Sequence, residues 1–195
     1  MFKFMPIERA ILSMTVRHLP SPLEGHPRKI DSLAVDFRNK TQAYLPCRNA
    51  IISCNQEEPI IVYVTKMQPF SSRIYNVAAR TNEQSASNQR LVAIARVYSG
   101  NLRVGSRVYV FGANHSPEQP DVTEVEVPHL FLLMGQSLEP INSVGPGCIV
   151  GIGGLENVLL KTGTISSTID CPNFSKLFGL SKGLVKVTIE PKMLM

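Results

Sequence analysis

The sequence LVAIARVYSG (91–100) is the clearest strand signal in this 195-residue chain. Its β-branched and aromatic residues, followed by a glycine, are typical of a strand that ends in a turn. A similar run, PIIVYVTKM (59–67), precedes it, and a third strand is predicted from Arg103 to Phe111. Gly100-Asn101 lies between the second and third runs and is a plausible hairpin turn. These runs predict consecutive antiparallel strands.

Further strand signals continue toward the end of the chain. They recur at intervals of about 8 to 15 residues with glycine and proline turns between them, which favours a small antiparallel barrel or sandwich. No helical pattern follows the strands, and this argues against a parallel α/β sheet. The runs are TEVEVPHLFLLM (123–134), CIVGIGGL (148–155), VLLKTGTISS (158–167) and LVKVTIEPKM (184–193).

A helical lead-in is predicted before these strands, over residues 6–19. Ile7, Ile11 and Met14 fall on one apolar stripe at helical spacing. The sequence Leu19-Pro20-Ser21-Pro22 ends the helix, because a residue before proline avoids helical backbone angles. The predicted fold is therefore mainly β, a small antiparallel β-barrel with an N-terminal helical lead-in.

Two other segments carry weaker signals. Residues 20–58 are mixed and polar and are predicted to be a connector, with a short helical turn near Ile30 and Leu33. Residues 68–90 are polar and have no clean period, so a loop or a truncated insertion is predicted there.

Composition leaves several classes of protein open. The net charge of +5 permits a nucleic-acid or acidic partner without requiring one. No apolar run reaches the ~18 residues of a membrane span, and no signal-peptide cleavage site is found, so neither is predicted. The cysteines fit no zinc spacing and are predicted to be reduced structural thiols. They are Cys47, Cys54, Cys148 and Cys171.

Motifs of catalysis and nucleotide binding are incomplete. The G-x-S-x-G match at 179–183 lacks a following helix and a later histidine. The sequence Asn39-Lys40-Thr41-Gln42 lacks the aspartate that reads guanine. No phosphate loop exists, because Leu160 stands where a glycine must precede Lys161-Thr162. Glu124 and Glu126 are predicted to form an exposed strand face. No catalytic, cofactor-binding or metal-ligating residue is therefore predicted in this chain.

Three arginines are candidate RNA contacts. Arg96, Arg103 and Arg107 are interleaved with Tyr98 and Tyr109 around the predicted hairpin. Arginine and tyrosine together can hold a phosphate backbone and stack on bases. The same pattern also fits an ordinary solvated face of a mildly basic domain, and both interpretations stay open.

The order of the sequence blocks resembles the second domain of the elongation factor 2 and G family of translational GTPases. This resemblance implies a translation-factor barrel over 59–183. It implies that 1–58 comes from the end of a GTPase domain and that 184–195 is the first strand of a third domain. The blocks are HLPSP (18–22), EEPIIVYVTKM (57–67), AIARVYSG (93–100), RVYVFGANHSP (107–117), LFLLMGQSLEPI (130–141), GPGCIVGIGGL (145–155), LLKTGTI (159–165) and VTIEPKM (187–193).

Within this family, the blocks at 130–141, 151–155 and 187–192 look more like the elongation-factor-like GTPase of large ribosomal subunit maturation. That similarity implies a non-catalytic barrel of a cytoplasmic GTPase. The whole enzyme would work with the Shwachman-Bodian-Diamond syndrome protein to release the anti-association factor from the large subunit. GTP and Mg²⁺ would bind the GTPase domain of the parent chain, and this chain alone would be inactive.

Two alternatives stay open. One is the second domain of elongation factor 2, which acts in ribosomal translocation, or of its spliceosomal relative. The other is a self-standing RNA-binding β-barrel. In the maturation GTPases a long insertion occupies the slot of residues 68–89, and the short segment here leaves open any partner contact that such an insertion makes.

Overall fold

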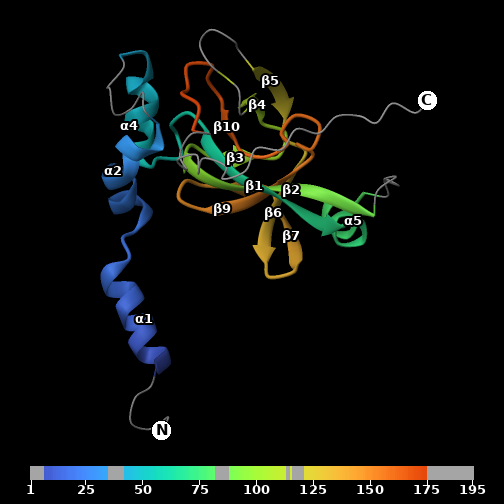
Figure 1. Ribbon diagram of the computed structural model, residues 1–195, viewed down its shortest axis with the longest axis horizontal. Coiled ribbons are helices and arrows are strands. Elements are labelled where there is room, and N and C mark those ends of the chain that lie inside the picture. The colour runs from blue at the N-terminus through green and yellow to red at the C-terminus, as the bar shows by residue number, and fades with distance from the viewer. Residues whose placement is uncertain (1–6, 35–41, 82–87, 113–114, 116–120, 175–195) are drawn as a thin grey trace, which may run out of the picture.

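An antiparallel sheet forms the centre of the molecule in the computed structural model, which describes residues 7–34, 42–81, 88–112, 115 and 121–174. Its eight strands lie in the order β5-β4-β10-β1-β2-β9-β6-β7, and β3 pairs with β8 in a second, two-stranded sheet. Helices α2 and α4 lie at one end of the long β1–β2 pair and α5 at the other (Figure 1). The strands are β1 (Ile61–Ser71), β2 (Gln89–Ser99), β3 (Leu102–Arg103), β4 (Arg107–Phe111), β5 (Val122–Glu126), β6 (His129–Met134), β7 (Ser137–Ile141), β8 (Ser143–Val144), β9 (Ile149–Gly153) and β10 (Gly163–Ser166). The mainly β, antiparallel fold predicted from the sequence is confirmed.

The sheet curls so that one face encloses the main hydrophobic core. Val64 and Ala95 pair across β1 and β2 and point inward, and Leu102 of β3 and Val144 of β8 join the same core from the small sheet. Each valine or leucine side chain buried in this way stabilises the fold by about 1.5–3 kcal/mol. The curled sheet with its enclosed core gives the domain its barrel character.

A β-bulge at Thr65 divides β1 into two parts. The register shifts between Val64 and Lys66, and the Thr65 hydroxyl donates a hydrogen bond to the Ile94 carbonyl oxygen at 3.0 Å. A bulge inserts one residue into a strand and bends it locally. Beyond the bulge, β1 pairs only with β2 among the described residues. From Pro69 and Leu91 onward β2 has no β9 neighbour, and the two strands continue as a ribbon to Ser71 and Gln89.

The segment predicted as a connector is instead largely helical. It contains α2 (Pro22–Leu33), the short 3-10 helix η1 (Gln42–Tyr44) and α4 (Leu45–Ser53). His26, Ile30 and Leu33 occupy one buried stripe of α2, and they pack with α4 on the outer face of the sheet. The stripe is short and lies among prolines, including Pro27 inside the helix, and this weakens the sequence signal.

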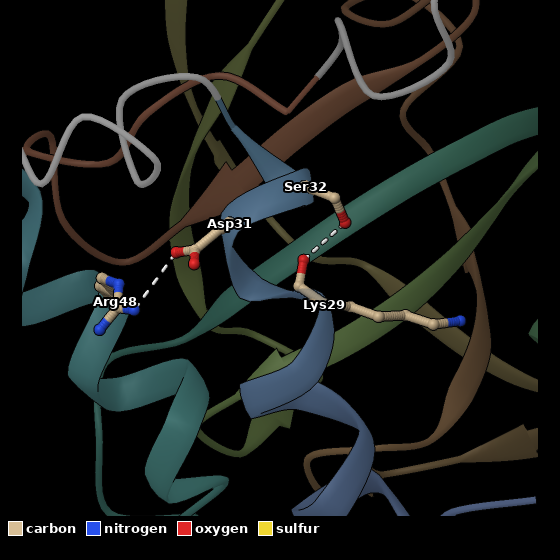
Figure 2. Close-up of polar contacts among 4 residues, drawn as sticks. All are labelled: Lys29, Asp31, Ser32 and Arg48. Carbon is tan, nitrogen blue, oxygen red and sulfur yellow. Dashed lines mark hydrogen bonds and ion pairs between the residues drawn. The ribbon is translucent and has the colours of Figure 1, made fainter.

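Helices α2 and α4 are also joined by an ion pair at their surface. The Arg48 guanidinium of α4 forms an ion pair with the Asp31 carboxylate of α2, with 3.2 Å between Nη2 and Oδ1 (Figure 2). Within α2 itself, the Ser32 hydroxyl next to Asp31 donates a hydrogen bond to the Lys29 carbonyl oxygen at 2.6 Å. Because surface ion pairs contribute about 0–1 kcal/mol, buried apolar contacts supply most of the stability of this helix pair.

The loop predicted over residues 68–90 is also wrong in large part. Strand β1 runs to Ser71, α5 spans Ser72–Ala79, and β2 begins at Gln89. Tyr75 and Ala78 of α5 are buried against a small core on the outer face of the sheet, which includes Phe131. With only these two buried positions, the helix has too short an apolar stripe to stand out in the sequence.

Several strand boundaries also differ from the prediction. The Gly100-Asn101 turn does not form a hairpin, because β3 pairs with β8 and not with β2. The strand predicted over 103–111 splits into β3 and β4, and the run at 123–134 splits into β5 and β6. The segment that contains Pro140 forms the edge strand β7 and is not one of the proline turns expected between strands. An edge strand tolerates proline because its outer side needs no partner.

The predicted first helix is confirmed as α1 (Ile7–His18), but its apolar stripe is not buried. Ile7, Ile11 and Met14 are exposed, and α1 extends away from the barrel (Figure 1). None of the helices in the described part of the chain is long and apolar enough to cross a membrane. The strand predicted over 184–193 lies outside the described residues.

Candidate functional site: an outer groove of the barrel

The structure does not place the three candidate arginines on one hairpin. Arg96 lies on β2 between β1 and β9, Arg103 lies on the small β3–β8 sheet, and Arg107 begins β4 opposite Glu126 of β5. Arg103 and Arg107 are exposed, whereas Arg96 is half-buried. The three arginines therefore do not form one continuous strip, and Arg96 has a separate environment.

Arg96 lies on the outer face of the sheet, in a shallow groove between the helical covers. Helices α2 and α4 cover one end of this face and α5 covers the other. Between them, two rows of cross-strand neighbours face outward, and we call this region the outer groove. The first row is Tyr63, Arg96 and Ile149, and the second is Lys66, Ile94 and Gly151, a row that Phe131 continues beneath α5.

A pocket of about 270 Å³ occupies the end of the outer groove near α2. Arg96 lies over the Tyr98 ring, with 5.9 Å from its guanidinium carbon to the ring centroid. Behind it, Tyr98 contacts the ring of His26 on α2. The pocket therefore combines a fixed cation with aromatic and aliphatic walls. Its lining residues are Tyr63, Thr65, Ile94, Ala95, Arg96, Tyr98 and Ile149.

Two polar atoms of this pocket are buried without a partner among the described residues. They are Nε of Arg96 and the hydroxyl oxygen of Tyr63, a residue that is only 2% exposed. Burial raises the pKa of Tyr63, so its hydroxyl stays a neutral donor at neutral pH. Buried donors are normally hydrogen-bonded. These two atoms have almost no exposed surface, so an acceptor in the pocket reaches Arg96 through the other nitrogens of its guanidinium.

A larger pocket of about 510 Å³ lies at the other end of the outer groove, near α5. It shares Ile94 with the first pocket, so the two are adjacent along the sheet. Its walls are mainly apolar or uncharged, and Lys66 is the ionic group among them. The lining residues are Lys66, Gln68, Pro69, Phe70, Ser71, Ile74, Ile94, Leu133, Gly135 and Gln136.

Other sequence candidates do not contribute to this groove. Glu124 and Glu126 are exposed on the edge strand β5, as predicted. All four cysteines are free thiols, and no group of three or more His, Cys, Asp or Glu side chains within the described residues could hold a metal ion. The G-x-S-x-G match at 179–183 lies outside the described residues.

The described residues do not form the phosphate-binding turn that GTP requires. The sequence has no phosphate loop, and Lys161-Thr162 leads into strand β10, so no helix N-terminus follows these residues. Backbone N–H groups at a glycine-rich turn before a helix are what hold nucleotide phosphates in such loops.

The described residues thus define a small antiparallel β-barrel domain with helices on its outer face. The family model of elongation factor G domain 2 matches residues 63–168, and the chain belongs to this family. The chain is also 26% identical to "Ribosome assembly protein 1" of Schizosaccharomyces pombe (strain 972 / ATCC 24843), in an alignment that covers 97% of this chain and 24% of that protein. It therefore spans about a quarter of the length of this relative, and it matches the relative well beyond the barrel.

Proposed function

We propose that this chain is the second domain of a GTPase that matures the large ribosomal subunit. In this proposal residues 1–58 end a GTPase domain, 59–183 form the barrel, and 184–195 begin a third domain. The parent protein binds GTP and Mg²⁺ and acts in the cytoplasm. It releases the anti-association factor together with the Shwachman-Bodian-Diamond syndrome protein.

The observation that carries this proposal is the similarity to a ribosome assembly protein over 97% of the chain. The similarity includes the helical region before the barrel, which a match to the barrel family alone does not cover. The buried contacts between α2, α4 and the sheet support a rigid connection between the two parts. Such a connection can pass a change of nucleotide state from one domain to the next.

Depletion of the protein that contains this chain tests the proposal. Large ribosomal subunits isolated after depletion should retain the anti-association factor, and the full-length protein should restore its release. Retention should also follow depletion of the Shwachman-Bodian-Diamond syndrome protein. Normal release together with a block in translocation would assign the chain to elongation factor 2 instead.

The nucleotide part of the proposal has its own test. The 195-residue chain should show no GTP binding by isothermal titration calorimetry, whereas the full-length protein should bind GTP with Mg²⁺. Heat of binding to the isolated chain would contradict the proposal.

RNA contact by Arg96, Arg103 and Arg107 remains a second proposal, supported by the positive charge of the chain. It predicts salt-dependent affinity, with a shallower log–log slope when Arg103 and Arg107 become alanine. No RNA affinity at low salt would contradict it.

A further inference from the structure

We propose that the outer groove binds an extended, acidic and apolar peptide segment of a separate protein. In this arrangement a carboxylate of the peptide pairs with the guanidinium of Arg96, and a neighbouring apolar side chain enters the larger pocket beside Phe70.

The charges of the groove favour an anionic partner. Both cationic side chains among the lining residues, Lys66 and Arg96, are unopposed, because no carboxylate lines either pocket. The described residues offer Arg96 no ion-pair partner, and its Nε is buried and unsatisfied. A carboxylate accepts charge-assisted hydrogen bonds from a guanidinium. A carboxylate in this pocket therefore supplies the ion-pair partner that Arg96 lacks among the described residues.

The walls of the groove favour a peptide over RNA. Ile149 is 57% exposed in the first pocket, and Ile94 and Leu133 continue the aliphatic floor into the second. The tyrosine rings of the groove are not accessible to a stacking base. Tyr63 is buried, and Tyr98 is packed against His26 and Phe174. An RNA strand that follows the groove also needs repeated cations for its phosphates, and only one lies in each pocket.

The helices at the two ends of the outer groove limit the length of the peptide that can bind there. Helices α2 and α5 lie at opposite ends of the same face, and the two pockets share Ile94 between them. A peptide in extended conformation advances about 3.3 Å per residue, and its alternate side chains point to the same side. It can therefore place an acidic and an apolar residue in the two pockets from one short segment.

Selection of peptides on the intact 195-residue chain tests the proposal. A random dodecapeptide phage library is selected on the immobilised chain and depleted on its Arg96→Gln variant. Enriched sequences should carry Asp or Glu close to Leu, Ile, Phe or Met. The most enriched peptide, labelled with fluorescein, is then the probe in anisotropy titrations. Replacing its acidic residues by the corresponding amides should weaken binding at least about tenfold.

Variants of the chain distinguish binding in the groove from nonspecific attraction by the net positive charge of the chain. Arg96→Gln and Ile149→Asp should each weaken binding of the probe peptide at least about tenfold. Arg17→Gln changes the net charge equally but lies on the exposed helix α1, outside the groove, so it should leave the affinity within about twofold. Ile149 is exposed, so its variant tests the groove even where Arg96→Gln lowers stability, which thermal unfolding of each variant records.

Three outcomes would overturn the proposal. The first is enrichment of peptides without acidic residues, or no enrichment at all. The second is binding of decauridylate RNA that Arg96→Gln and Ile149→Asp weaken while no peptide binds. The third is a full-length protein that does not bind the probe peptide although the 195-residue chain does, since the parent chain would then fill its own groove.

Discussion

The ring of His26 on α2 packs on the ring of Tyr98 on β2, with centroids 5.0 Å apart and planes tilted by 42°. His26 is buried, and its Nδ1 lies 3.3 Å from the Ile51 carbonyl oxygen of α4. One side chain thus contacts the barrel and both helices that cover it. Burial lowers the pKa of His26, and this effect outweighs the raising effect of the contact with the Ile51 carbonyl. The imidazole is therefore neutral in the folded protein at neutral pH.

Stability should decrease as the pH falls through the mildly acidic range. The unfolded chain takes up a proton at His26 near pH 6.5, whereas the folded chain does so only at a lower pH, because its pKa is depressed. Stability from neutral His26 is thus fully present above about pH 6.5 and is lost as the pH falls through the folded pKa. Thermal unfolding followed by circular dichroism between pH 7.5 and 5 measures the effect.

A His26→Phe variant keeps an aromatic ring beside Tyr98 and removes the titration. Its melting temperature should vary less over the same pH range than that of the unchanged chain. His18 on α1 is exposed, so His18→Phe serves as the matched control and should keep the full pH dependence. An unchanged pH dependence in His26→Phe would assign the acid sensitivity to other groups.

Gly100 should be much less tolerant of alanine than Gly135. Both have positive φ, 76° and 63°, which costs a non-glycine residue about 1–2 kcal/mol. At Gly100 an added Cβ would lie 2.7 Å from the Ile60 Cα, whereas at Gly135 it would meet nothing within 4 Å. Urea unfolding should therefore give a loss of more than about 2 kcal/mol for Gly100→Ala and about 1 kcal/mol for Gly135→Ala. Equal losses would show that backbone conformation alone matters at Gly100.

The strands were predictable because their alternation is a local property. In β2, Ala93, Ala95 and Val97 point inward and Arg96 and Tyr98 point outward, as the period of two requires. Pairing was not predictable, because Gly100 turns the chain close past Ile60 instead of returning it as a hairpin. A turn signal marks a change of direction but does not identify the next partner strand.

The candidate site was predictable only in part. The sequence identifies Arg96 as a candidate, but the residues next to it in the sequence do not distinguish it from Arg103 and Arg107. Its distinct environment arises because β1 and β9 place Tyr63 and Ile149 on either side of it. Alternation alone could have assigned Tyr63 to the outer face. The bulge at Thr65 carries no sequence signal, and without it the position of Lys66 on the same face could not be derived.

The packing of α5 on the sheet should make alanine substitutions at two adjacent residues of β6 differ in their cost to stability. Phe131 is fully buried and contacts the Tyr75 ring edge to face at 5.4 Å, whereas Leu132 is 44% exposed. Phe131→Ala should destabilise the chain by about 3–5 kcal/mol because it leaves a cavity in this core. Leu132→Ala should cost less than about 1 kcal/mol. Urea unfolding of both variants measures the difference, and a small effect of Phe131→Ala would mean that α5 contributes little to the fold.

Three of the four free thiols should react with iodoacetamide in an order set by their environments. Cys148 is exposed and should be alkylated first. Cys54 is half-buried, and burial raises the pKa of its thiol, so it should follow more slowly, because the thiolate is the reactive form. The hydrogen bond with Cys47 and burial raise the pKa of Cys171 well above its usual range. Cys171 should therefore react only after unfolding.

Peptide mass spectrometry over a time course measures each rate, and Cys148→Ser should remove the fastest phase alone. Labelling of Cys171 at the rate of Cys148 in native buffer would contradict the close packing of α4 against the segment that follows β10.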